Sequence, residues 1–149
     1  MRAVVQRVSE AVVFAGGAVC GSIGAGLLVY LGVERDDDQA DVDYLADKVR
    51  HLRIFRDEGN RMNLDVAQVG GHVFVVSAFT VAGDARRGRR PTFEGAAEAD
   101  RAFVLYEVFC DRLAGMGVRV ARGSFGDDME VRSVNAGPVC ILVESRRRF

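Results

Sequence analysis

Two short segments carry the groups best suited to chemistry. The first, Asn135-Ala136-Gly137-Pro138-Val139-Cys140, places one of the chain's two prolines after a glycine, where the flanking residues indicate a strand. Proline cannot donate to a strand ladder, and X-Pro is the linkage in which a cis bond is cheap. The second, Ser77-Ala78-Phe79-Thr80-Val81, ends an apolar run and precedes a basic loop. Together they predict a site made mainly of backbone groups, which selects its ligand by shape.

Few side chains are suited to catalysis. An alcohol such as Thr80 acts as a nucleophile when a positioned base activates it, and neither His51 nor His72 has a clear claim to that role. Backbone N–H groups around Phe79 and Thr80 are candidates to stabilise an oxyanion instead, a contribution of roughly 3 kcal/mol per well-placed donor.

The cysteines do not indicate a disulfide framework or a metal site. Cys20, Cys110 and Cys140 are scattered and lack metal-ligand spacing, so we expect buried thiols and neither a disulfide nor a zinc site. Cys140 lies in the pattern of a buried strand, where packing is its expected role. A cysteine hydrolase that uses Cys140 with His72 is a minor alternative.

The elements that position these segments begin with strands. Alternation from Ala3 to Val13, followed by Gly16-Gly17, predicts two strands joined by a hairpin turn. The apolar run from Gly26 to Val33 predicts a central strand buried on both faces. A further strand from His72 to Val81 carries the Ser77–Val81 segment at its carboxyl end.

Two helices and three closing strands complete the pattern. Apolar residues at helical spacing predict one helix that ends near Leu52 or Phe55 and another from Ala96 to Met116. Met62-Asn63-Leu64 reads as a short irregular piece. The closing strands are expected over 118–121, 129–134 and 139–144. We therefore predict an α/β fold, a single compact domain over residues 1–149 with two main helices packed on a mixed sheet.

Composition and charge set limits on location and partners. The chain has 149 residues, is 49% hydrophobic, and contains no apolar run approaching the roughly 20 residues of a membrane span. Its first residues lack a signal peptide's apolar stretch, so we expect a soluble, cytoplasmic protein without a membrane partner. The net charge of −1 hides a basic loop with Arg86, Arg87, Arg89 and Arg90. This loop is a candidate for binding nucleic-acid phosphates, the alternative being a solvated surface loop.

With these elements placed, the chain resembles the D-aminoacyl-tRNA deacylases, also called D-tyrosyl-tRNA deacylases. The similarity runs nearly end to end, and several separated motifs in the same order are more specific than any one of them. The motifs are Met1-Arg2-Ala3-Val4-Val5-Gln6-Arg7-Val8, Gly21-Ser22-Ile23-Gly24, Gly26-Leu27-Leu28-Val29, Lys48, Leu52-Arg53-Ile54-Phe55, Met62-Asn63-Leu64, Gly88-Arg89-Arg90-Pro91, Phe125-Gly126-Asp127-Asp128-Met129 and Asn135-Ala136-Gly137-Pro138-Val139.

The resemblance implies a barrel-like mixed sheet and a homodimer with active sites at the subunit interface. It implies an enzyme that needs no metal or organic cofactor and hydrolyses the ester joining a D-amino acid, or mischarged glycine, to the 3′ end of tRNA. Gly137-Pro138 matches a family pair that has a cis bond, enters the site of the partner subunit and excludes L-amino acids. Arg7 matches an arginine that holds this pair, and Met129 matches a methionine that lines the pocket.

The second segment matches the family motif Ser-Gln-Phe-Thr-Leu. It makes Ser77, Phe79 and Thr80 candidates for catalysis and Ala78 a candidate for substrate binding. In the family the threonine was proposed as nucleophile, and a later view gives the 2′-hydroxyl of the terminal adenosine a role in activating water. We expect ester hydrolysis assisted by the RNA.

Two residues depart from the family pattern. The motif glutamine is Ala78 here, and the threonine that follows Gly-Pro-Val is Cys140. Loss of the amide removes a possible hydrogen bond to substrate. The alternative function is therefore a catalytically weakened paralogue that binds aminoacyl-tRNA or another RNA without turnover.

Overall fold

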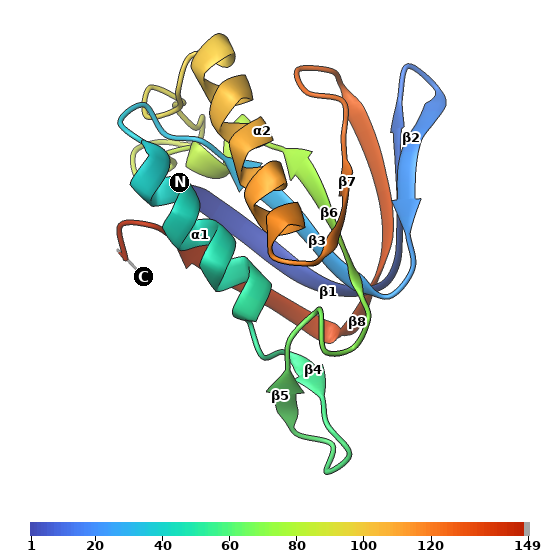
Figure 1. Ribbon diagram of the computed structural model, residues 1–149. Coiled ribbons are helices and arrows are strands. Elements are labelled where there is room, and N and C mark those ends of the chain that lie inside the picture. The colour runs from blue at the N-terminus through green and yellow to red at the C-terminus, as the bar shows by residue number, and fades with distance from the viewer. Residues whose placement is uncertain (148–149) are drawn as a thin grey trace.

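The computed structural model describes residues 1–147 (Figure 1). Two helices lie against a curled, nearly closed mixed sheet, and a small separate hairpin extends below it. In chain order the elements are β1 (Arg2–Ala15), β2 (Ala18–Ile23), β3 (Gly26–Gly32), α1 (Gln39–His51), β4 (Phe55–Arg56), β5 (Met62–Leu64), β6 (His72–Ser77), the short 3-10 helix η1 (Phe79–Ala82), α2 (Ala99–Gly115), β7 (Arg119–Arg122) and β8 (Met129–Glu144).

The long strand β1 organises the sheet. Along one edge its first half pairs antiparallel with β3 and its second half with β2, while β8 pairs antiparallel along the other edge. Beyond β3 the order continues with β6 and β7, both in parallel register. The carboxyl ends of β3 and β6 therefore lie side by side, with Leu31 opposite Ser77.

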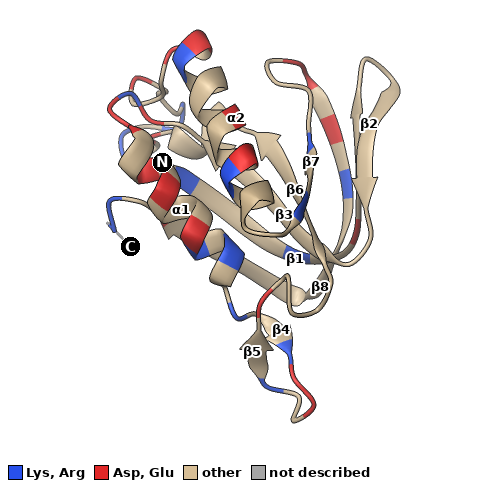
Figure 2. Ribbon diagram, viewed as in Figure 1, with Lys and Arg blue, Asp and Glu red and all other residues tan. Residues whose placement is uncertain are grey.

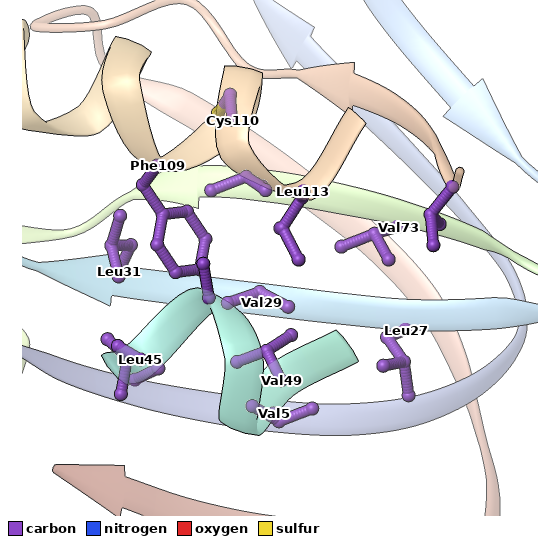
Figure 3. Close-up of a cluster of buried hydrophobic side chains, with 14 of the residues drawn as sticks. Val5, Leu27, Val29, Leu31, Leu45, Val49, Val73, Phe109, Cys110 and Leu113 are labelled. Atoms are coloured by element: carbon purple, nitrogen blue, oxygen red, sulfur yellow. The ribbon is translucent and has the colours of Figure 1, made fainter. Parts of the chain in front are cut away.

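Strand β3 is buried on both faces, which explains its continuous apolar run. Leu27, Val29 and Leu31 contribute to a core cluster that includes residues of α1 and α2, as Figure 3 shows. Leu28 alternates to the other face and joins Phe74 in a second cluster inside the curl of the sheet. The prediction of a central strand is confirmed, because β3 lies between β1 and β6.

Helix α1 begins where its sequence provides a capping box. The Asp38 carboxylate accepts hydrogen bonds from the backbone N–H groups of Ala40 (2.8 Å) and Asp41 (3.3 Å). The Asp41 carboxylate in turn accepts from the backbone N–H of Asp38 at 3.0 Å. These contacts satisfy donors that the first helical turn leaves unpaired.

Three expected boundaries are wrong. The strand expected over 72–81 ends at Ser77, and a 3-10 helix replaces its last residues. The strands expected over 129–134 and 139–144 are one strand, β8, with an interrupted ladder. The irregular piece at 62–64 is strand β5, paired with β4.

The second helix begins at Ala99, three residues later than expected. Residues 148–149 of the predicted domain lie outside the described part of the chain. Within residues 1–147, no helix combines the length and the apolar character that crossing a membrane requires.

Candidate active site

A pocket of about 610 Å³ lies at the carboxyl end of β6. Four of the predicted site residues line it together, namely Ser77, Ala78, Phe79 and Thr80, and Met129 joins them from β8. The remaining lining residues lie in or next to β3, β6, α2 and β8, with Phe93 in the basic loop. They are Tyr30, Leu31, Val33, Val76, Phe93, Ala96, Ala97, Glu98, Ala99, Ala102, Tyr106, Phe125, Gly126, Asp127, Asp128 and Val131.

The chain turns sharply at the pocket because one backbone hydrogen bond ends the sheet and another begins a turn. The N–H of Ala78 still donates to the Leu31 carbonyl at 2.8 Å, as a continuing strand would. The N–H of Val81 then donates back to the Ala78 carbonyl at 3.0 Å. The N–H groups of Phe79 and Thr80 come before the Val81 N–H in the chain, so the turn does not use them. Neither donates to the backbone of another described residue outside η1. They are free to meet a ligand oxygen.

Aromatic rings form part of the pocket wall. Phe79 is 60% exposed, and its ring packs edge-on against Phe93 with centroids 5.1 Å apart. Phe125 packs at 5.2 Å from Phe103 and 5.5 Å from Tyr106. An apolar, aromatic wall of this kind suits the flat face of a nucleobase.

Among residues 1–147, no side-chain base makes a hydrogen bond with the Thr80 hydroxyl. The described lining of the pocket contains no histidine, lysine, arginine or cysteine. His51 is exposed at the end of α1, and His72 begins β6 at the end opposite Ser77. The titratable acids of the lining are Glu98, Asp127 and Asp128, and none of them is hydrogen-bonded to Thr80. The groups next to Thr80 that can act on a ligand are therefore backbone donors and the ligand's own groups.

Tyr106 supports the pocket from behind. Its hydroxyl donates to the Val75 carbonyl at 2.9 Å, which ties α2 to β6. Burial raises the pKa of this hydroxyl well above its ordinary value, so it stays a donor. Beside it, burial raises the pKa of the Cys110 thiol to about 12.

The Gly137–Pro138 segment is exposed and protrudes from the sheet. Its peptide bond is cis, as the resemblance implies. Gln6 pairs with Cys140 and Val8 pairs with Asn135, so four residues of β8 stand opposite Arg7 alone. The Asn135 side chain closes this protrusion by accepting a hydrogen bond from the N–H of Val139 at 2.9 Å.

Arg7 holds the protrusion from below. Its side chain is almost completely buried, and its Nε donates to the Ala136 carbonyl at 2.9 Å. Its Nη1 donates to the Ile54 carbonyl at 2.5 Å, at the entry to the β4–β5 hairpin. One guanidinium therefore joins three segments that are distant in sequence.

The structure does not bring this protrusion to the pocket of the same chain. Arg2, at the start of β1, lies 3.5 Å from the Val81 carbonyl next to Thr80. Arg7 lies five residues further along β1, roughly 16 Å away at the usual rise of a strand. Within one chain, the two predicted halves of the site are separate.

The basic loop is shaped by one of its own arginines. Backbone hydrogen bonds of 2.8 and 2.9 Å pair Asp84 with Thr92, and Arg86 binds the Asp84 carboxylate with Nη2 at 2.6 Å from Oδ2. Hydrogen bonds from Arg86 hold the pKa of Asp84 well below its usual range. Arg87, Arg89 and Arg90 are exposed, and Figure 2 shows the basic residues of this loop beside the start of α2.

The expectation for the thiols is wrong for two of the three cysteines. Cys110 is buried, whereas Cys20 and Cys140 are exposed. Cys140 faces outward on β8, where Val134 and Leu142 are also 51% and 59% exposed. Neither Cys140 nor His72 lines the pocket, so the structure gives no support to a cysteine hydrolase.

Sequence reasoning missed the pocket roles of Tyr30, Phe93 and Tyr106. Phe93 lies in the basic loop, which we considered only for its arginines, and Tyr106 lies within the helix expected from Ala96 to Met116. Tyr30 lies in an apolar run that predicted the strand but gave no sign that the carboxyl end of this strand lines a pocket. For Tyr30 and Phe93 the available signal is their position, two residues before the end of β3 and inside the basic loop. Tyr106 lies in the middle of α2, and no local signal marks it.

Comparisons with known proteins agree with this geometry. Residues 4–144 match the family described as D-Tyr-tRNA(Tyr) deacylase. A D-aminoacyl-tRNA deacylase of Anaeromyxobacter dehalogenans is 57% identical over 149 residues, all of both chains. The solved structure of a protein named c-Myc DNA Unwinding Element Binding Protein is 34% identical, with a TM-score of 0.92 over 97% of this chain and 98% of the other. A probable eukaryotic D-amino acid tRNA deacylase, 18% identical over 96% and 98%, shares the fold with a TM-score of 0.82.

Proposed function

Because the chain belongs to the D-Tyr-tRNA(Tyr) deacylase family, we propose that it releases D-amino acids and mischarged glycine from tRNA and rejects L-aminoacyl-tRNA through the backbone of Gly137-Pro138. The observation that carries this proposal is the separation of two halves of one site. Gly137 and Pro138 do not line the pocket of their own chain. They protrude from the sheet opposite Arg7, away from that pocket.

A second copy of the chain joins the two halves. In the proposed homodimer, the protrusion of each protomer enters the pocket of the other. The outward face of β8 supports this arrangement, because exposed Val134 and Leu142 flank Gly137-Pro138 on either side along the strand. Apolar side chains of this kind are typical of a surface that another chain covers.

The filter selects by exclusion. Backbone carbonyls held beside the α-carbon of the substrate leave room for a hydrogen on one side and none for a side chain, so the L-form clashes. Glycine has no side chain and passes. Arg7, with its two carbonyl partners, keeps the filter in place, so it is a positioning residue.

The chemistry is hydrolysis of an ester. Water attacks the ester carbonyl, the bond to the 3′-oxygen breaks, and that oxygen takes a proton to leave as the tRNA hydroxyl. The N–H groups of Phe79 and Thr80 stabilise the oxyanion, and the 2′-hydroxyl of the terminal adenosine orients the water. Ser77, Ala78 and Met129 shape the binding wall.

The rest of the tRNA lies outside the pocket. Arg87, Arg89 and Arg90 are placed in the loop that leads from Thr80 to Phe93, so they are suited to the phosphates of the acceptor end, with Arg86 bracing the loop. We place this activity in the cytoplasm, where charged tRNA is used.

The test is release of free amino acid from D-tyrosyl-tRNA and from glycyl-tRNA. We expect multiple turnovers on both substrates, and a mass in solution of twice the 16.2 kDa chain. A protein that binds charged tRNA in a salt-sensitive way without releasing amino acid would be the binding paralogue instead. A stable monomer with full activity would contradict the shared site.

A further inference from the structure

Tyr30 is a polar group in the pocket that has no assigned role. It lies on β3 directly opposite Val76 of β6 and lines the pocket with its side chain partly buried. Side chains alternate along a strand, so Tyr30 shares the face of Leu28 inside the curl of the sheet, where it packs against the second core cluster.

The Tyr30 hydroxyl is unused by the protein. Among residues 1–147 it makes no hydrogen bond, in contrast to the Tyr106 hydroxyl, which donates to the Val75 carbonyl. Burial raises the pKa of Tyr30 above its ordinary value, so the phenol is neutral and can both donate and accept.

Ala78 lies on the same face of the sheet as Tyr30. Its backbone is still extended, with φ −146° and ψ 84°, so alternation from Val76 places its methyl group on the face of Tyr30. Both residues line the pocket. Most of the pocket wall is apolar, and the phenol adds a hydrogen-bonding group to it.

We propose that Tyr30 is a substrate-binding residue whose hydroxyl hydrogen-bonds the terminal aminoacyl-nucleoside of the tRNA. This inference rests on the proposed function of the pocket. A nucleoside that enters an apolar pocket loses its hydrogen bonds to water, and each of its polar atoms then needs a partner from the wall. Tyr30 supplies such a partner where the chain has only a methyl group at position 78.

The test compares Tyr30→Phe with Tyr44→Phe. The second variant removes the same hydroxyl from α1, where the Tyr44 ring contacts Lys48 and Arg147 and lies outside the pocket. Steady-state kinetics on D-tyrosyl-tRNA and glycyl-tRNA should show kcat/KM lowered about threefold to tenfold by Tyr30→Phe, the range expected for one hydrogen bond. The loss should fall on KM, because binding to substrate and transition state is weakened alike.

The unfolding temperature should stay within about 2 °C of wild type for both variants, which separates a contact from a structural role. A Tyr30→Phe enzyme with kcat/KM within twofold of wild type would overturn the inference. So would a loss confined to kcat, or one matched by Tyr44→Phe. A wild-type protein without turnover would refute the proposed function instead, so the two failures are distinguishable.

Discussion

Substitution of Gly137 by alanine tests how tightly the proposed filter is held. The residue has φ +133°, where a side chain costs about 1–3 kcal/mol. A Cβ at this position would lie 2.7 Å from Nη2 of Arg7 and 2.9 Å from Cγ2 of Val139. The guanidinium would have to move and lose a charge-assisted hydrogen bond, worth about 1.5–3 kcal/mol.

The two contributions give a loss of about 4 kcal/mol in the free energy of unfolding, or about 8–16 °C in Tm. Urea unfolding at fixed protein concentration measures it, together with kcat/KM on D-tyrosyl-tRNA, which should fall. Gly17→Ala is the matched control, because its φ is +80° and its Cβ would meet nothing within 4 Å. That variant should lose about 1–2 kcal/mol and keep its activity. Equal losses in the two variants would refute the claim that Arg7 confines the filter.

Three further predictions concern the chemistry, the RNA and the pH dependence. Thr80→Ala should keep kcat within about tenfold of wild type, because no side-chain base among residues 1–147 is hydrogen-bonded to its hydroxyl. Replacing Arg89 and Arg90 by alanine should lower the slope of log KM against log salt concentration by about 1.5–2, because two phosphate contacts are lost. Asp65→Asn should destabilise the fold by about 2 kcal/mol at pH 7 and by progressively less below pH ~4.

The contacts of Asp65 explain why Asp65→Asn should destabilise the fold at pH 7 and less so at low pH. Burial alone would raise the pKa of Asp65, but hydrogen bonds from the Gln68 backbone and from Arg50 outweigh burial and lower it. A lowered pKa stabilises the fold above the unfolded value, and that stability is lost as pH falls through the folded one.

Asp47 and Arg112 lie outside the sites being tested and provide control variants. Asp47→Asn, whose carboxylate is 66% exposed, should change stability by less than about 0.5 kcal/mol. A pH-independent effect of Asp65→Asn would contradict the Arg50 pairing. Arg112→Ala, in a pair with Asp43 on α1, should leave the salt slope unchanged. Thr80→Ala that binds tRNA normally but is inactive would identify Thr80 as the nucleophile.

The sequence predicted the helices and the central strand because burial follows their periodicity. Val42, Leu45 and Val49 recur at helical spacing, and all three are buried. The turn at Phe79-Thr80-Val81 was missed because aromatic and β-branched residues favour strands. The turn depends on tertiary contacts, namely the Ala78–Leu31 hydrogen bond and the packing of Phe79 on Phe93.

Exposure on β8 was equally beyond local pattern. Cys140 and Leu142 lie two residues apart in an apolar segment, as residues on one buried face of a strand do. In a single chain, however, that face is exposed. The link from Arg7 to Ile54 joins residues 47 positions apart, and no local signal marks it. The motifs marked the two segments that we propose as halves of the site. The resemblance implied that they meet across two subunits, and the fold gives the physical reason, because the segments lie apart within one chain.

The most direct measurement is the ratio of kcat/KM for D-tyrosyl-tRNA and L-tyrosyl-tRNA prepared on the same tRNA. A backbone filter that excludes the L side chain by about 4 kcal/mol predicts a ratio on the order of 10³ in favour of the D-form. A ratio near one, with both esters hydrolysed, would contradict the account.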